Sequence, residues 1–170
     1  MNKRLIISLL FMIFLTVPIF SLDFDAYRPI DYPEFIQIFK ATDSQTPGIS
    51  IFRRNILRVH AILHEYPKIV DDSDINNLRF AFMNLGIHPD DVSYFGYKVE
   101  YTFPSNVEWQ EETKLIFYIQ NVQREHFEKD FKINDPIYWF VVFNTFNSFS
   151  QQGYILVSNF MNEEQFAMNN

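Results

Sequence analysis

Two histidines lie four residues apart, at a spacing that would let both bind one metal ion. His60 and His64 fall within the segment 49–66, whose apolar residues repeat with a helical period. On a helix, imidazoles at i and i+4 lie on the same face, as they do in many zinc sites. The neighbouring Glu65 points about 100° away from His64, and no second Glu-x-x-His element follows. We therefore expect two boundary histidines with their polar tips in water, and metal binding is the weaker alternative.

Aspartates gather at two places in the middle of the chain. Asp71, Asp72 and Asp74 are followed by Asp90 and Asp91, and clusters of carboxylate oxygens are typical calcium ligands. The segment starting at Asp71 has, however, neither the glycine nor the twelfth-position glutamate of a calcium-binding loop. Acidic residues are also favoured in the first turn of a helix. We therefore interpret these aspartates as helix caps and first-turn residues.

The residues needed for covalent or cofactor-dependent catalysis are missing or out of pattern. The chain has no cysteine and 4 glycines, which excludes thiolate catalysis and disulfides and leaves no glycine-rich phosphate-binding loop. No serine lies in a Gly-x-Ser-x-Gly elbow. We predict a non-enzymatic protein without a cofactor. The remaining enzymatic alternative is a hydrolase with dispersed acid–base groups, because such sites need no linear motif.

The strongest compositional signal is an excess of aromatic residues, with 20 Phe, 9 Tyr and 2 Trp. A large aromatic core is the simplest interpretation. Two functional interpretations compete with it, namely an apolar pocket for a lipid-like ligand and an aromatic surface that docks a partner protein. The candidate interaction or pocket residues are Tyr97, Tyr101, Phe117, Tyr138, Trp139, Phe143, Tyr154 and Phe160.

The segment 49–66 is predicted to form a long helix. Its apolar residues step by 4, 3, 4 and 3, which places them on one stripe. These residues are Phe52, Ile56, Val59, Leu63 and Tyr66. The loop predicted at 42–48 would precede this helix, because its residues are typical of turns.

Two further helices are expected around the first. The apolar spacing of 74–85 predicts a helix with Asp74 or Ser73 as its N-cap and Gly86 directly after its end. The proline-containing segment 22–33 is expected to be an extended arm. A short helix should follow it from Pro33, and its buried side would consist of Phe35, Ile36 and Phe39.

From residue 96 the apolar pattern changes to a period of two or to continuous apolar runs, which predicts strands. The predicted strands are 96–103, 113–123, 137–147 and 154–161. The short connection between the last two predicts an antiparallel hairpin.

Helices followed by strands predict an α+β fold, in which two or three N-terminal helices pack on a four-stranded antiparallel sheet. The sheet is a meander that can curl. The arm and its short helix occupy 22–48, the single domain 49–161, and a flexible tail 162–170.

The first 21 residues have the pattern of a secretory signal peptide. Lys3 and Arg4 precede an apolar run, Pro18 ends it, and Ser21 is a small residue before the expected cut. The alternative is an uncleaved membrane anchor, because residues 5–22 are just long enough to cross a bilayer. We predict cleavage after Ser21 and export from a bacterium, to the periplasm in preference to the extracellular medium.

The formal net charge of −7 argues against a nucleic-acid-binding protein, whose surface would be basic. We therefore expect an exported, non-enzymatic envelope protein that binds another envelope protein or itself. The contact would use the aromatic sheet surface or an edge strand, and 154–161 lacks the charges and prolines that usually protect an edge. The alternative is a carrier of a lipid-like ligand in an apolar pocket under a curled sheet.

Overall fold

The computed structural model describes residues 24–31, 34–35, 49–52, 56–103, 113–147 and 149–169. The predicted signal peptide, the predicted loop 42–48 and the residues Ile36 and Phe39 lie outside the described residues. The strands are β1 (Arg28–Ile30), β2 (Ile49–Phe52), β3 (Leu57–Ile62), β4 (Lys68–Ile69), β5 (Phe95–Phe103), β6 (Thr113–Gln120), β7 (Pro136–Asn147) and β8 (Gln152–Met161). The α-helices are α3 (Asp72–Leu85), α4 (Arg124–Asp130) and α5 (Glu163–Met168), and the 3-10 helices are η1 (Phe24–Ala26), η2 (Pro89–Tyr94) and η3 (Asn121–Gln123).

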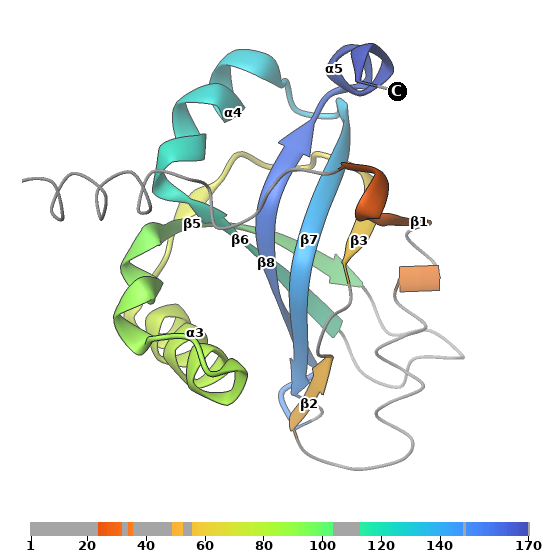
Figure 1. Ribbon diagram of the computed structural model, residues 1–170. Coiled ribbons are helices and arrows are strands. Elements are labelled where there is room, and N and C mark those ends of the chain that lie inside the picture. The colour runs from red at the N-terminus through yellow and green to blue at the C-terminus, as the bar shows by residue number, and fades with distance from the viewer. Residues whose placement is uncertain are drawn as a thin grey trace, which may run out of the picture.

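The described strands form one mixed, eight-stranded sheet. Its order is β1-β3-β7-β8-β6-β5-β4, and β2 pairs with the far end of β7 (Figure 1). The pairs β1–β3 and β6–β8 are parallel, whereas the other pairs are antiparallel. The prediction of N-terminal helices on a four-stranded antiparallel sheet is therefore wrong.

The error comes from the segment 49–66, which forms β2 and β3 instead of a helix. Leu57, Val59, Ala61 and Leu63 are all buried, so the segment follows a period of two as well as a helical period. Two members of the predicted helical stripe, Ile56 and Tyr66, are 39% and 41% exposed. Pairing of β3 with β7, from Leu57–Val141 to Ile62–Pro136, decides between the two patterns.

The four strands predicted in the C-terminal half are confirmed as β5, β6, β7 and β8, and β7 and β8 form the predicted antiparallel hairpin. β8 lies between β7 and β6, so it is a central strand. Its apolar residues, which would favour association with another chain if they lay at an edge, are consequently covered by neighbouring strands and by the core. Contact with a partner through 154–161 as an unprotected edge strand is therefore excluded, because β8 has a neighbour on both sides.

The main core lies on one face of the sheet and collects residues from β3, β5, β6, β7 and β8. Trp139, Phe117 and Val157 are completely buried there, and Phe127 and Phe131 of the α4 segment close the cluster. Because strands from all along the sheet contribute to one cluster, the sheet curls around it. In Figure 1, β5 and β6 accordingly cross the direction of β7 and β8.

The opposite face of the sheet is covered at two separate places. Leu78 and Phe82 of α3, together with Val92 of η2, pack on β6 and β8. Tyr27 and partly buried Phe24 and Phe166 pack around Phe140 of β7. The segment predicted as an extended arm therefore contributes η1 and Tyr27 to the cover of this face and β1 to the sheet itself. Cover on both faces explains why the central strands are apolar on both faces.

Two short helices form where the sequence pattern predicts none: α4 lies in the connection between the predicted strands 113–123 and 137–147, and α5 lies in the predicted tail 162–170. α4 buries one aromatic side chain, Phe127, in the main core. α5 begins at a capping box, in which Asn162 accepts from the backbone of Gln165 and the Gln165 side chain accepts from the backbone of Asn162. Among the described residues, no helix combines the length and apolar character required to cross a membrane.

The predicted helix 74–85 is confirmed, and it starts slightly earlier as α3. Its N-cap is Asp71 rather than Ser73 or Asp74. At its C-terminal end, Gly86 adopts a left-handed conformation with φ of 74°, while the amides of Gly86 and Ile87 bond to Met83 and Phe82. This is the Schellman arrangement, which favours glycine at that position.

We expect Gly86→Ala to lower the free energy of unfolding by about 1–2 kcal/mol, because a Cβ is strained in the left-handed conformation. No heavy atom lies within 4 Å of the site where that Cβ would be placed, so the cost comes from the backbone alone. Asn76→Ala on the exposed side of α3 is the control and should stay within about 0.5 kcal/mol. Urea denaturation of both variants measures the difference, and equal stabilities would contradict the assigned cap.

Candidate functional site

The structure places most of the predicted interaction residues inside the protein. Tyr101, Phe117, Trp139 and Phe160 share the main core, and Tyr97 packs against it. Tyr154 belongs to the cluster under α3, and half-buried Tyr138 packs beside Phe140. The side chain of Phe143 lies outside the described ones. The seven described side chains therefore occupy both faces of the sheet and form no common exposed surface.

The two candidate metal-binding histidines are surface residues at and after β3. The His60 ring stacks on Tyr138 with 4.6 Å between ring centroids, and the His64 ring meets Tyr101 edge-on at 6.0 Å. In the described parts of the chain, no three His, Cys, Asp or Glu residues come together in a group that could hold a metal ion. The two imidazoles thus have aromatic neighbours but no third ligand among those residues.

The central aspartates lie at helix starts, as the sequence indicates: Asp71 is the N-cap of α3, and the other four lie in the first turns of α3 and η2. Asp71 and Asp74 accept hydrogen bonds from each other's backbone amides at 2.9 Å. The backbone amide of Asp90 donates to His88 Nδ1 at the start of η2. Asp74 has a second role that the sequence does not indicate, because it is 3% exposed and faces a lysine of the sheet.

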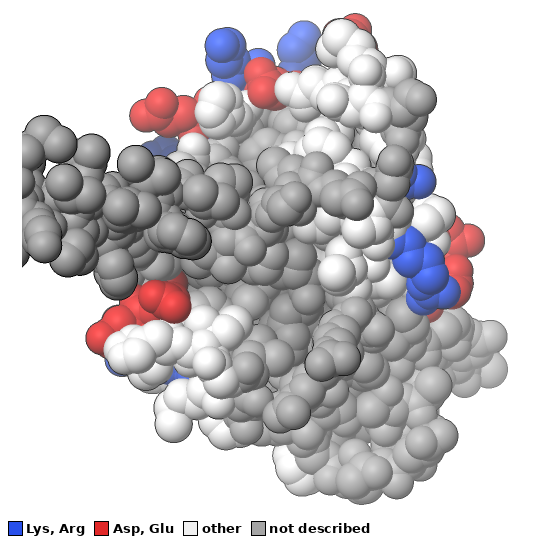
Figure 2. Space-filling model, in the orientation of Figure 1, with Lys and Arg blue, Asp and Glu red and all other residues white. Residues whose placement is uncertain are grey.

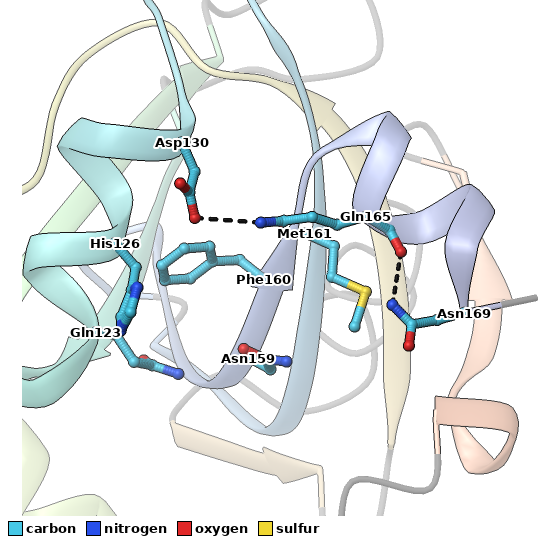
Figure 3. Close-up of a pocket in the computed structure, with 8 residues that line it drawn as sticks. All are labelled: Gln123, His126, Asp130, Asn159, Phe160, Met161, Gln165 and Asn169. Carbon is cyan, nitrogen blue, oxygen red and sulfur yellow. Dashed lines mark hydrogen bonds between the residues drawn. The ribbon is translucent and has the colours of Figure 1, made fainter.

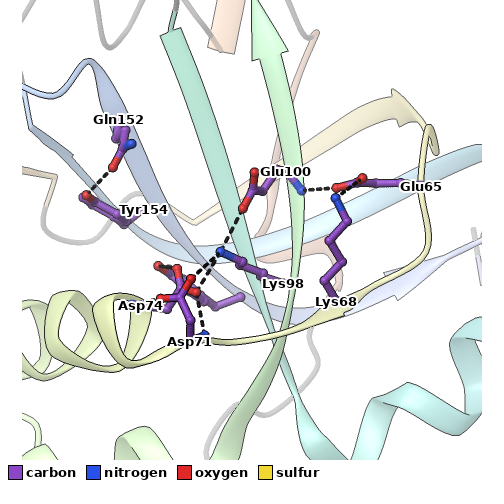
Figure 4. Close-up of polar contacts among 9 residues, drawn as sticks. Glu65, Lys68, Asp71, Asp74, Lys98, Glu100, Gln152 and Tyr154 are labelled. Atoms are coloured by element: carbon purple, nitrogen blue, oxygen red, sulfur yellow. Dashed lines mark hydrogen bonds and ion pairs between the residues drawn. The ribbon is translucent and has the colours of Figure 1, made fainter.

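That lysine, Lys98 of β5, lies at the centre of a charged cluster under the first turn of α3 (Figure 4). Its Nζ is 2.8 Å from Asp74 Oδ2, 2.8 Å from Glu100 Oε1 and 3.6 Å from Asp71 Oδ2. The hydroxyl of buried Tyr118 donates to Asp74 Oδ1 at 2.9 Å. The cluster joins α3 to β5 and β6, and every charge in it has a partner.

The pKa values in this cluster follow from burial and from these partners. Burial opposes the charge of Lys98, but the hydrogen bonds to Asp74 and Glu100 outweigh it, and the pKa of Lys98 is raised. The pKa of Tyr118 is raised by burial first and by the nearby Asp74 carboxylate second. Both groups therefore keep their protons throughout the neutral range, which favours a structural role over proton transfer.

A pocket of about 320 Å³ opens between α4, the end of β8 and α5 (Figure 3). Two apolar residues of β8, Phe160 and Met161, line it together with polar side chains from all three elements. The polar lining consists of Gln123, His126, Asp130, Asn159, Gln165 and Asn169. Asp130 Oδ2 accepts from Gln165 Nε2 at 3.1 Å, which ties α4 to α5 across the opening.

A second exposed feature lies on the side of α3 that faces away from the sheet. Phe80 is 47% and Met83 is 67% exposed, whereas Leu78, Ala81 and Phe82 of the same helix are buried. Adjacent exposed apolar side chains can mark a docking surface, whereas single ones are normal on any protein. Phe80 and Met83 lie three residues apart and are neighbours on one face of the helix. The neighbouring η2, which packs against α3, also has an exposed aromatic residue, Tyr94, at 49% exposure.

Charges elsewhere on the surface are mixed. On the face shown in Figure 2, basic side chains lie beside acidic ones at the upper edge and at the right of the view. Exposed ion pairs such as Arg28–Glu34 and Arg124–Glu128 are examples of this arrangement. This face therefore presents both signs of charge to a partner.

The chain matches no protein-family model, and no curated protein or solved structure is detectably similar to it. Its function must therefore be inferred from its own surfaces. The pocket and the outer face of α3 were both missed at the sequence level. Two signals could have indicated them. For the pocket, the signal is the helical spacing of His126 and Asp130; for the outer face of α3, it is the position of Phe80 and Met83 opposite Leu78 and Phe82.

Proposed function

We propose that this protein is an exported, non-enzymatic protein of a bacterial envelope that binds another envelope protein. Export is proposed from the basic and apolar pattern of residues 1–21. The binding surface is the outer face of α3. The observation that carries the proposal is the joint exposure of Phe80 and Met83, at 47% and 67%, on the face of α3 opposite Leu78 and Phe82, which are buried against the sheet.

The surface that we propose differs from the one expected from the sequence. The aromatic residues of the sheet are mostly engaged in packing, and β8 is central. Among the described strands, the two ends of the sheet order are short and protected, because β1 contains Pro29 and β4 consists of Lys68 and Ile69, whereas the four-residue β2 pairs with β7 alone and has neither proline nor charge. Proline and lysine both oppose the addition of a foreign strand, so helix docking is better supported than strand addition.

The charge around α3 defines the chemistry of the partner. Residues 71–91 contain five aspartates and one arginine, and Asp71 and Asp90 are 64% and 85% exposed. A complementary partner therefore presents an apolar groove with a basic rim, which would steer the encounter and weaken with added salt. We commit to such a partner rather than to a second copy of this chain, since two acidic surfaces would repel.

The test is site-specific photo-crosslinking in the producing cells. A photoreactive side chain in place of Met83 should crosslink to one envelope protein. The same group at Val122, an apolar position in η3 that is even more accessible at 77% exposure, should not. The crosslinked protein is then purified, and its affinity for the wild-type chain is measured at two salt concentrations.

Two results would contradict this proposal. One is a crosslink from Met83 only to a second copy of the chain, with a dimer in sedimentation. The other is an identical set of crosslinks from Met83 and Val122. An affinity for the purified partner that does not change with salt would show that the partner has no basic rim.

The carrier of a lipid-like ligand is less well supported. Such a carrier needs an enclosed apolar cavity, whereas the pocket described above has six polar residues among its eight lining residues. No observation within the described residues favours the hydrolase alternative.

A further inference from the structure

The pocket between α4, β8 and α5 is built from side chains that are held in fixed orientations. Gln123 accepts from the backbone amide of Gln120 and donates to the carbonyl of Ser158 at 2.8 Å. Gln165 accepts from the backbone of Asn162 and donates to Asp130. These two amides and the Asp130 carboxylate therefore form a rigid rim, which lowers the entropy cost of binding a ligand.

Two other polar groups in the pocket are available to a ligand. Within the described residues, neither the His126 imidazole nor the Asn159 amide makes a side-chain hydrogen bond. In Figure 3 both lie at the same side of the opening as Gln123, across from the Asp130–Gln165–Asn169 row. A neutral imidazole and an amide each offer a donor and an acceptor, so the two together present both kinds of group.

The charge and shape of the pocket limit the class of ligand. Neither lysine nor arginine lines it, and the Asp130 carboxylate would repel an anion. One carboxylate, already hydrogen-bonded to Gln165, is a weak site for a cation. Phe160 and Met161 are the apolar members of the lining; they belong to core clusters on opposite faces of the sheet and expose only 7% and 6% of their surface. Its volume of about 320 Å³ is near the lower end of the range for small-molecule sites.

We propose that this pocket binds a single neutral polyhydroxy unit, such as one sugar residue. A hydroxyl group both donates and accepts, so a ring of hydroxyls matches His126, Asn159 and Asp130 better than a purely donating or purely accepting ligand does. The small exposed parts of Phe160 and Met161 are the apolar contact that the pocket offers to a sugar ring. This site is separate from the α3 surface and does not depend on the protein partner proposed above.

The experiment is an NMR titration of the full chain with glucose and N-acetylglucosamine, with inorganic phosphate and 1,4-diaminobutane as the charged probes. We expect the side-chain signals of His126 and Asn159 to shift saturably with at least one sugar, with a dissociation constant on the order of 1–10 mM. Asn159→Leu and His126→Phe should each weaken binding about 3- to 10-fold, the effect of one hydrogen bond. His88→Phe, an exposed histidine outside the pocket, should leave binding unchanged.

Each remaining outcome overturns the proposal. Saturable shifts of the same signals with phosphate or the diamine, but not with sugars, would reject the ligand class. No saturable shift with any of the four probes, in a protein with an intact spectrum, would reject the site. Sugar binding that survives both pocket variants would place the ligand elsewhere on the protein.

Discussion

Trp139→Ala is expected to lower the free energy of unfolding by about 3–5 kcal/mol, the range for emptying a large buried aromatic site. Trp139 has no exposed surface, and its ring packs against Phe117, Phe127 and Phe160. Its indole N–H donates to the Tyr101 hydroxyl at 3.0 Å, so the substitution also leaves that buried hydroxyl without this donor. Chemical denaturation monitored by circular dichroism measures the effect.

The neighbouring residue supplies the control. Tyr138 points to the other face of β7, where it is half-buried between His60 and Phe166. Tyr138→Ala should cost clearly less than Trp139→Ala, about 1–2 kcal/mol. A loss below about 1 kcal/mol for Trp139→Ala would contradict its central place in the core.

Lys98→Met is expected to cost about 3–5 kcal/mol, because it leaves the buried Asp74 carboxylate without its cationic partner. Asp74 also receives the Tyr118 hydroxyl and the Asp71 amide, so it cannot turn toward water without breaking the start of α3. Lys68→Met is the matched control, since Lys68 pairs with Glu65 but is 58% exposed. Its cost should stay between about 0 and 1 kcal/mol.

The origin of this cost can be separated from simple loss of packing. In the double variant Lys98→Met/Asp74→Asn the carboxylate charge is gone, so the double variant should be more stable than Lys98→Met alone. Because the pKa of Lys98 is raised in the folded protein, Lys98 contributes its full stabilisation at any pH below its pKa in the unfolded chain, which is about 10.4. It is lost only as the pH rises through the folded value. The difference between wild type and Lys98→Met should therefore be constant from about pH 6 to 9. A double variant as unstable as Lys98→Met would contradict the unpaired-charge explanation.

The C-terminal strands could be predicted from the sequence because their patterns are unambiguous. Alternation in β5 and long apolar runs in β6 and β7 fit no helix of a small protein, and the hairpin follows from a short connection. The segment 49–66 was ambiguous, because its apolar residues fit both periods. The choice depends on pairing with β7, about 80 residues further along the chain, and local spacing does not report that contact.

The candidate sites were hidden for a different reason. The pocket collects residues from three segments that are separate in the sequence, and two of them are short helices of 7 and 6 residues without a strong apolar period. The aromatic excess indicated burial correctly but could not separate a core from a docking surface. Curling of the sheet around one cluster decides that question, and it places Trp139 and Phe117 inside.

The central claim is that the protein acts through the outer face of α3. Its most direct test is the affinity of the envelope partner, identified by crosslinking, for the purified Met83→Lys variant, with Val122→Lys as the control. We predict that Met83→Lys weakens binding by about 10-fold or more, as substitution of a central contact does, while Val122→Lys binds like the wild type. Equal affinities of the two folded variants and the wild type would contradict the claim.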